Sequence, residues 1–310
     1  MKLKIVNHFF FLFVFLLFSC TSSSDQEIVK KDEIVEEEET PVEENNPPEE
    51  QVPNEEENST EKEDNIKWEN WYLSVPINSG AGKATSIRYE EIVKENLSAE
   101  ASKYFFRNSD GSYTLWTQFT GYTTSGFSAL GGKYCRTELR EFWKGVQDTK
   151  DNWSMKSGVH VLESTIQVDF VEGNGRTIVA QIHGKESEGI SGNPATVKIR
   201  WNSGMIQIDY YTKPEHSDPW TSAYDEKLDF GRVDHEIFTF KIKIEKGKLY
   251  CGLVCEAKGI NKAYTEIYDY VGNGYVHENY FKTGNYFGWH DDFEKSAQVV
   301  LHKVITEHKQ

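Results

Sequence analysis

From residue 66 onward, the sequence predicts an all-β domain, a sandwich of two antiparallel sheets or a jelly roll. Short runs of alternating apolar and polar residues recur through it, with Gly, Asn, Asp and Ser between them. Helical patterns are confined to residues 87–97 and 99–104, and both are short. All eight Trp and all sixteen Tyr fall in this domain, as is typical of β-rich cores and of sugar-binding surfaces. With about 245 residues, the domain is large enough for a single core.

The chain begins with a segment that resembles an export signal, residues 1–20. Lys2 and Lys4 precede an uncharged apolar run at 9–18, which is shorter than the roughly 20 residues that a transmembrane helix needs. The run ends in LFSC, which resembles a bacterial lipoprotein cleavage box. We therefore expect Cys20 to be lipid-modified. The protein would be exported and anchored to a bacterial outer membrane, at the cell surface or the periplasmic face. The alternative is an ordinary cleaved signal, after which the protein would be secreted.

Residues 21–65 have the composition of an acidic linker. Between 25 and 64 there are eighteen Asp and Glu, three Lys, four Pro and no aromatic residue. Such a segment cannot bury enough apolar surface to offset the entropy lost on ordering, so we expect it to be disordered. It accounts for nearly all of the net charge of -16. The acidity of the whole chain therefore does not exclude an acidic ligand for the domain at 66–310.

The predicted strands follow one another at short intervals along this domain. In chain order they are 71–77, 112–118, 136–143, 159–171, 177–183, 195–201, 205–211, 237–244, 248–254, 280–286 and 297–305. Cys251 and Cys255 fall in one of them, where four residues span about 13 Å. A disulfide needs Cα atoms within ~7 Å. With Cys135 as the remaining cysteine of the domain, we expect no disulfide to organise the fold.

Polar residues share one face of the strand at 136–143. Period-2 alternation puts Arg136, Glu138 and Arg140 on one side, and Thr137, Leu139 and Glu141 on the other. A glutamate between two arginines can fix both guanidinium groups and leave donors for a carboxylate ligand. The alternative for this segment alone is a charge ladder on an exposed strand.

Three further strands carry polar faces. On 177–183, Val179, Gln181 and His183 are predicted to face away from a core that receives Ile178, Ala180 and Ile182. An amide two residues from an imidazole suits binding and proton transfer, although a lone His on a strand is often merely solvated. On 280–286 the shared face shows Tyr280, Lys282, Gly284 and Tyr286, for which ordinary Tyr packing is the alternative. The strand at 195–201 places Lys198 and Arg200 on one face.

Taken together, three of these segments resemble a known family. They read RTELR at 136–140, QIH at 181–183 and YFKTGNY at 280–286. In this order they are similar to the three signature regions of polysaccharide lyase family 7, the alginate lyases, and weaker similarity covers residues 67–306. The resemblance implies a β-jelly roll with an open substrate cleft. It also implies an anionic polysaccharide, alginate, as partner. We expect no nucleic-acid partner, no cofactor, no metal and a monomeric protein.

The resemblance also implies roles for the polar residues in β-elimination. Arg136 and Gln181 would neutralise the uronate carboxylate, with Glu138 and Arg140 fixing the arginine. Tyr286 would protonate the leaving oxygen and, for some sugar stereochemistries, also act as the base. His183 would be the base when the proton lies on the opposite face. To act as the base, Tyr286 needs nearby positive charges that favour its phenolate form. The groups expected to supply those charges or bind neighbouring sugars are Lys198, Arg200, Lys282 and Tyr280.

Two positions depart from the family pattern. Thr283 stands where Ala is usual, and Gly288 where Gln is usual; the segment 287–295, with Trp289, His290, Asp291 and Asp292, is also unusual. We expect these changes at the cleft rim. Ile182 in QIH is associated with guluronate in the family. The Gly- and Ser-rich stretch 121–133 could form a lid over the cleft.

Three alternative functions remain open at this stage. A lyase acting on glucuronan or ulvan would share the same carboxylate-neutralising groups. A β-sandwich glycoside hydrolase needs two carboxylates at close spacing, and the E-x-D-x-x-E pattern of one such family is absent from the sequence. A non-catalytic carbohydrate-binding lipoprotein would keep aromatic and cationic residues, but has no need for Gln181, His183 and Tyr286 together.

Overall fold

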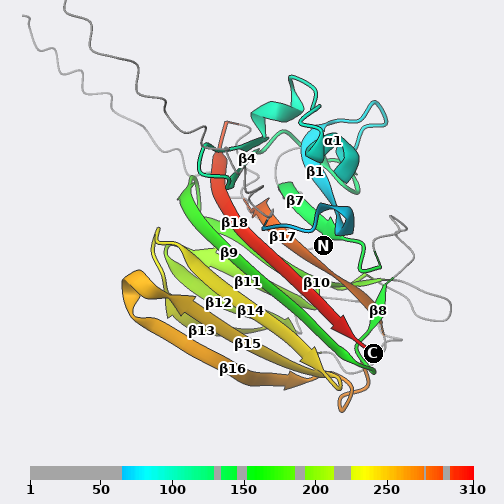
Figure 1. Cartoon of the computed structure of the whole chain (residues 1–310), viewed down its shortest axis with the longest axis vertical. Coiled ribbons are helices and arrows are strands. Elements are labelled where there is room, and N and C mark those ends of the chain that lie inside the picture. Colours follow the sequence, from blue (N-terminus) through cyan, green and yellow to red (C-terminus); the bar gives the residue numbers. More distant parts are fainter. Residues whose placement is uncertain are drawn as a thin grey trace, which may run out of the picture. The chain divides into compact units, whose positions relative to one another are not determined.

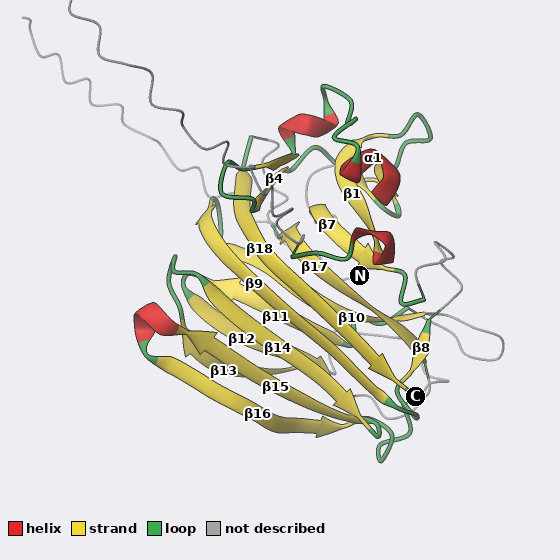
Figure 2. Ribbon diagram, in the orientation of Figure 1, coloured by secondary structure: helices red, strands yellow, loops and turns green. Residues whose placement is uncertain are grey.

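Two antiparallel sheets dominate the structure, a computed structural model (Figures 1 and 2). It describes residues 65–128, 134–144, 152–185, 193–212, 225–275, 277–288 and 294–310. All of them belong to the unit Thr60–Gln310. Cys20, and all of the predicted linker except its last residue, Asn65, lie outside the described residues. The domain boundaries expected from the sequence therefore stay predictions.

The nine-stranded sheet contains the strands with the polar faces. Its order is β13 (Asp225–Arg232), β12 (Met205–Tyr211), β11 (Val197–Asn202), β10 (Arg176–Lys185), β17 (Glu278–Phe287), β7 (Cys135–Glu141), β1 (Trp71–Asn78) and β2 (Ala84–Arg88), with β8 (Trp153–Ser154) paired to β17. Strands far apart in the sequence are thus neighbours: β17 lies between β7 and β10.

The seven-stranded sheet covers one face of the first. Its order is β16 (Ile260–Asp269), β15 (Lys248–Cys255), β14 (Phe238–Glu245), β9 (Val159–Val171), β18 (Ser296–Lys309), β4 (Tyr113–Gln118) and β3 (Phe105–Arg107). A small separate sheet joins β5 (Tyr122–Thr123) and β6 (Gly126–Phe127) within the stretch expected to form a lid. The helical elements are short: α1 (Tyr89–Val93), η1 (Trp68–Asn70), η2 (Ala101–Lys103) and η4 (Glu256–Lys258). Among the described residues, no helix is long and apolar enough to cross a membrane.

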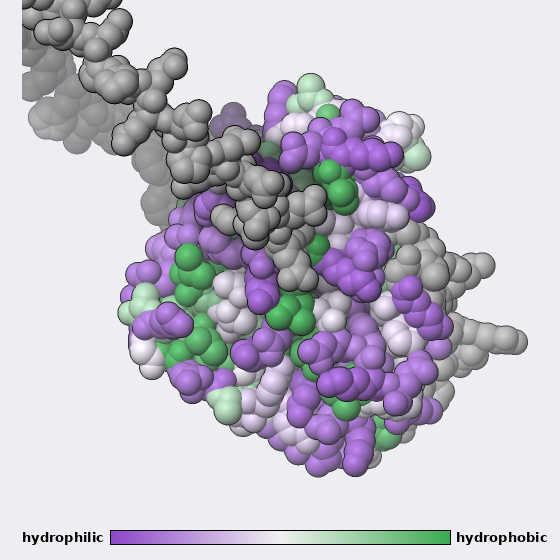
Figure 3. Space-filling model, in the orientation of Figure 1, coloured by the Kyte–Doolittle hydropathy of each residue, from purple (hydrophilic) through white to green (hydrophobic). Residues whose placement is uncertain are grey.

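The core lies between the two sheets. In the seven-stranded sheet, alternate residues of the central strands point into it. Along β14, residues that are buried alternate with residues that are half-exposed, and β9 follows the same pattern over most of its length. The inward side chains include Leu162, Ile166, Phe240, Ile242 and Val299. Removal of this apolar surface from water is the main force that holds the sheets together. The outer face over β9, β14–β16 and β18 is mostly hydrophilic, with small scattered apolar patches (Figure 3).

The middle of the nine-stranded sheet departs from this pattern. All seven residues of β7 are buried, including Arg136, Glu138 and Arg140, and so are most residues of β10 and β17. Charged residues are rarely buried unless they are paired or functional. The outward face of this sheet is therefore where a site is expected.

The predicted β-sandwich is confirmed, and each predicted strand matches an observed one within a few residues. The four edge strands, β2, β3, β13 and β16, were missed, and so were the two-residue strands β5, β6 and β8. In β13 and β16 many residues are exposed and the alternation is weak. The helix expected at 87–97 shrinks to α1, since Ile87 and Arg88 complete β2. Cys135, Cys251 and Cys255 are buried free thiols.

Candidate active site

Strand pairing brings the three polar motifs together on the outward face of the nine-stranded sheet. On β17, Tyr286 lies opposite Arg136 of β7, and Lys282 lies opposite Arg140. On the other side of β17, Lys282 lies opposite Gln181 of β10, and Tyr280 opposite His183. Residues separated by more than a hundred positions therefore form one continuous polar surface.

Glu138 is the centre of this surface and is fully buried. Its carboxylate accepts hydrogen bonds from Arg136 Nη1 at 3.0 Å and from Gln181 Nε2 at 2.5 Å, and forms an ion pair with Lys282. Burial alone would raise the pKa of Glu138, but Lys282 and Arg136 together hold it below its ordinary value. The ionised carboxylate thus fixes three groups that can bind an anion.

Arg136 retains an unused donor. Its Nε is buried and has no hydrogen-bond partner among the described residues, and its guanidinium lies 3.7 Å from the centre of the Tyr286 ring. A buried donor without an acceptor costs about 1–3 kcal/mol, which a ligand oxygen could recover. Burial, assisted by Arg136, lowers the pKa of Lys282 to about 8, with Glu138 acting in the opposite direction. Around neutral pH the centre carries more positive than negative charge.

Arg140 has a different set of contacts from the one expected. Its Nη2 donates to Asn152 Oδ1 at 2.8 Å, its Nη1 donates to the main-chain oxygen of Glu141, and its guanidinium lies 4.1 Å from the centre of the Tyr280 ring. Glu138 instead contacts Arg136, Gln181 and Lys282, so Lys282 fills the role that the sequence suggested for Arg140. Arg140 instead supports Tyr280.

His183 is neutral and has a defined tautomer. Burial, reinforced by the charge of Lys282, lowers its pKa to about 3. Its Nδ1 lies 2.8 Å from the carbonyl oxygen of Gly184, which can only accept, so Nδ1 carries the proton. The ring stacks on Tyr280 with centroids 5.3 Å apart. The lone pair of Nε2 is therefore available to take a proton.

Tyr286 is arranged as a proton donor. Burial raises the pKa of its phenol, and the nearby Arg136 opposes this without reversing it. In the absence of substrate the phenol therefore stays protonated, rather than being held as the phenolate that base duty would require. Tyr134 packs edge-on against the Tyr286 ring, with centroids 5.2 Å apart.

Lys198 and Arg200 lie further along the same face, on β11, and both are paired. Lys198 Nζ lies 2.5 Å from Asp225 Oδ2, and Arg200 Nη2 lies 2.7 Å from Asp209 Oδ2. A pocket of about 430 Å³ runs over these residues; its lining also includes Tyr134, Ile178, Gln181, Ala195, Lys227 and Tyr286. The two cations belong to the site surface, but each one already has a carboxylate partner.

A β-bulge changes one predicted face of β10. The register shifts between Ile178 and Ala180, so Ile178 faces the pocket, whereas Val179 packs in the core. The sequence predicted the reverse, because regular alternation cannot anticipate an extra residue. Beyond the bulge, Gln181 and His183 have the predicted orientation.

The two departures from the family pattern occupy different places. Thr283 lies in the interior and not at the cleft rim: it is fully buried, and its hydroxyl donates to the Val179 carbonyl at 3.0 Å and lies 2.9 Å from Ser164 Oγ. Gly288 lies beside Tyr134, which a side chain at that position would approach to 3.2 Å. Trp289, His290, Asp291 and Asp292 are outside the described residues. Gly284 has φ +140°, and a Cβ there would come within 2.8 Å of the Thr137 carbonyl oxygen, so only glycine allows this close approach of β17 to β7.

Sequence reasoning missed several residues of the site. Tyr72 lies on β1 directly opposite Arg140, and burial raises the pKa of its phenol. Alternation along the strand could have placed Tyr72 on the outward face, because Trp71 and Leu73 on either side of it are core residues. Asp209 and Asp225 could not, since their pairing with β11 cations depends on the register of two further strands.

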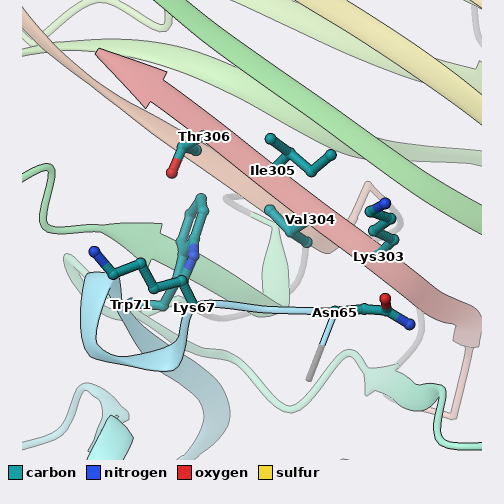
Figure 4. A pocket seen from close by; sticks show the side chains of 7 residues that line it. All are labelled: Asn65, Lys67, Trp71, Lys303, Val304, Ile305 and Thr306. Carbon is teal, nitrogen blue, oxygen red and sulfur yellow. The ribbon is translucent and has the colours of Figure 1, made fainter. Parts of the chain in front are cut away.

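Another hollow, of about 280 Å³, lies against β18 (Figure 4). Asn65, Lys67, Trp71 and residues 303–306 line it, and Trp71 points toward the strand. It contains none of the residues that the sequence predicted for the site. Within the described part of the chain, no group of three or more His, Cys, Asp or Glu is placed to hold a metal ion.

Comparisons with known proteins indicate the family of the chain. The sequence matches the model of the alginate lyase family over residues 65–308. A search of curated proteins gives no significant match. Among solved structures, alginate lyase A1-II′, a member of polysaccharide lyase family 7, has a TM-score of 0.63 and 23% identity, over 79% of this chain and 97% of that protein.

Two further solved structures have the same fold. Alginate lyases from Klebsiella pneumoniae and Pseudomonas aeruginosa each have a TM-score of 0.61 and 18% identity to this chain. Both cover 79% of it, over 97% and 100% of their own lengths respectively. The structural likeness establishes the β-jelly-roll fold, and the family model matches most of the sequence. The chain therefore belongs to the alginate lyase family, polysaccharide lyase family 7.

Proposed function

We propose that this protein cleaves alginate by β-elimination. The observation that carries the proposal is the group around Arg136: a buried donor without an acceptor lies beside a protonated phenol, Tyr286, on the same face as a neutral imidazole, His183. An anion binder, a proton donor and a proton acceptor are what the elimination of a uronate requires.

The reaction begins with neutralisation of the sugar carboxylate. The C5 proton of a uronate is hardly acidic while the neighbouring carboxylate keeps its full charge. Arg136 Nε and the second amide N–H of Gln181 would bind that carboxylate, while Glu138 fixes both groups. Lys282 would add positive charge as an enolate-like intermediate develops.

Two proton transfers complete the elimination. A base takes the C5 proton, the electron pair of that bond forms a C4–C5 double bond, and the C4–O bond breaks. Tyr286 donates its proton to the departing oxygen. His183 Nε2 takes the C5 proton when it lies on the face opposite Tyr286. For the other stereochemistry, Tyr286 would serve in both steps: it would first lose its own proton to solvent, then take the C5 proton as the phenolate and pass that proton to the departing oxygen. None of these steps uses a cofactor.

We propose that guluronate-containing blocks are preferred, and this rests on the QIH pattern. Ile182 itself is fully buried in the core, opposite Phe281 and Val197. Its influence on sugar choice would therefore act through the positions of Gln181 and His183. Two of the solved A1-II′ structures contain GGG as product and GGMG as substrate.

The decisive experiment follows the ultraviolet absorbance of the conjugated double bond that elimination creates and hydrolysis does not. Purified protein would be given alginate, polyguluronate, polymannuronate, glucuronan and ulvan. We expect a rise on alginate and its blocks that is lost in Tyr286→Phe, with an unchanged melting temperature. An increase in absorbance on glucuronan or ulvan alone would show that one of these polymers, and not alginate, is the substrate. Binding to polymer without any rise would indicate a carbohydrate-binding protein.

We further propose that the protein is a monomer, exported and lipid-anchored to an outer membrane through Cys20. Labelling with a palmitate analogue should mark the wild type and not Cys20→Ala; equal labelling would contradict the anchor. Light scattering of the domain would test the monomeric state.

A further inference from the structure

One flank of the pocket has the opposite hydrogen-bonding character from the polar surface around Glu138, which lies beside it. At the centre, Arg136 offers a donor without an acceptor. On the flank formed by β11–β13, Asp209 Oδ1 and Asp225 Oδ1 are buried acceptors without a donor among the described residues. Both aspartates line the pocket, and their side chains are only 1% and 8% exposed. The acceptors without a donor thus line the pocket, and the donor without an acceptor lies beside it, next to Tyr286 of the pocket lining.

Lys198 and Arg200 on this flank are not available to bind a sugar carboxylate, because each is already paired with an aspartate. Asp225 Oδ2 pairs with Lys198, and Asp209 Oδ2 accepts from both Nε and Nη2 of Arg200, at 3.2 and 2.7 Å. A sugar carboxylate placed here would meet two carboxylates whose charges are only just compensated. Like charges brought together in this way cost several kcal/mol. Lys227, which also lines the pocket, is exposed at its rim.

The free oxygens instead suit a ligand that donates hydrogen bonds. A carboxylate oxygen can only accept, and the hydroxyl groups of a sugar are neutral donors of the right size. A metal ion fits poorly, because Lys198 and Arg200 already place two positive charges against the same aspartates. Filling both acceptors would recover the cost of leaving them buried and unpaired.

We infer that the β11–β13 flank is a sugar subsite that reads hydroxyl groups rather than a carboxylate, with Asp209 and Asp225 as its specificity-determining residues. This inference rests on the proposed function, since it concerns a sugar next to the one that reacts. The unit bound at the centre must carry a carboxylate, whereas the unit on the flank need not. A polymer whose flanking unit is neutral is therefore a substrate.

The test uses alginate in which a fraction of the carboxyl groups has been reduced to hydroxymethyl groups. Binding of reduced and unreduced oligosaccharides would be measured by calorimetry on Tyr286→Phe, so that the result does not depend on turnover. In parallel, mass spectrometry of the wild-type products would locate neutral units. We expect neutral units next to the cleaved bond on one side only, and never as the new unsaturated end.

Asp225→Asn and Asp209→Asn, placed in the same Tyr286→Phe background, then test the two aspartates. Each keeps the side-chain shape, removes one negative charge and releases a cation. We expect the affinity for the unreduced oligosaccharide, divided by that for the reduced one, to rise about tenfold, corresponding to ~1.4 kcal/mol. Asp229→Asn is the matched control: Asp229 is an exposed aspartate on β13 whose Oδ1 already accepts from Gln207 at 2.7 Å, and its loss should not shift the preference.

The outcomes separate the two proposals. A tenfold or greater loss of binding on reduction, unchanged by both substitutions, would overturn the hydroxyl subsite even if the enzyme cleaves alginate. An equal shift in Asp229→Asn would also overturn it, because general charge would then be the cause. Binding that shifts as expected without any elimination would retain the subsite and remove the lyase assignment. If Asp209→Asn fails to fold, Asp225→Asn alone decides.

Discussion

Two glutamates on β7 are fully buried, three residues apart and on opposite faces of the sheet. Glu138 lies on the outward face of the sheet and is surrounded by Arg136, Gln181 and Lys282. Glu141 faces the interior. Its Oε2 accepts from Trp153 Nε1 at 3.1 Å and from the Phe281 backbone N–H at 2.9 Å, and its Oε1 lies 2.8 Å from His308 Nε2.

The surroundings of the second glutamate form a closed network. His308 Nδ1 lies 2.8 Å from His160 Nδ1, and His160 Nε2 faces the carbonyl oxygens of Ser154 and Ser157. Each polar atom named here has a partner. Around Glu138, by contrast, the positive charges outnumber the carboxylate and one guanidinium donor is unused. A buried charge therefore does not by itself identify a site; the unmatched donor does.

The largest effect is expected from removal of the interior glutamate. Glu141→Ala would leave three buried donors without their acceptor, and each such donor costs about 1–3 kcal/mol of unfolding free energy. Denaturant unfolding measures this. Glu141→Gln, which keeps an acceptor oxygen, should recover most of the loss. If the alanine variant were as stable as the wild type, the structural role of this network would be wrong.

On the pocket face we expect a comparable loss of activity without a loss of stability. Arg136→Lys keeps the charge but loses the planar donor group, and removal of one anion-stabilising donor lowers kcat by about 10²–10³-fold. The free energy of unfolding should stay close to that of the wild type. Arg176→Lys, at the exposed start of β10, is the matched control and should leave both quantities unchanged. A stability loss in Arg136→Lys as large as that of Glu141→Ala would remove the contrast between the two faces.

A smaller effect concerns pH. Lys282 has its pKa lowered to about 8, so its charge is present below that pH and is lost above it. kcat/KM should therefore fall as pH rises through about 8. Because Glu138 raises the pKa of Lys282, Glu138→Gln should move this alkaline limb to lower pH. His183, with a pKa of about 3, should produce no acid limb near 6.5. An unchanged alkaline limb in Glu138→Gln would show that another group sets it.

The smallest effect is expected at Thr283. Thr283→Ala removes the hydroxyl that bonds the Val179 carbonyl and Ser164, which should cost about 1 kcal/mol of unfolding free energy. kcat/KM and the preferred substrate should stay the same, because the side chain faces the interior. A change in substrate preference would place this position back in the cleft.

The sequence predicts the fold, and the faces on which most candidate site residues lie, for identifiable physical reasons. Alternation on β7 and β17 is regular, so the faces of Arg136, Glu138, Lys282 and Tyr286 could be read directly. The partners of Lys198 and Arg200 could not, because a charge pair across strands depends on register and not on spacing along the chain. The network of Glu141 was also hidden, since His160 and His308 come from two strands of the other sheet.

The bulge at Val179 changes which residues of β10 face the cleft. Cleft residues are even-numbered before it, as Ile178 is, and odd-numbered after it, as Gln181 and His183 are. Deleting one residue at the bulge would restore regular alternation along β10. The cleft residues either before or after the bulge would then turn toward the core. A strand transplanted from a protein without the bulge would do the same. In this chain the Thr283 hydroxyl donates to the carbonyl of Val179 at the bulge, so a contact in the interior holds the orientation of Gln181 and His183 on β10.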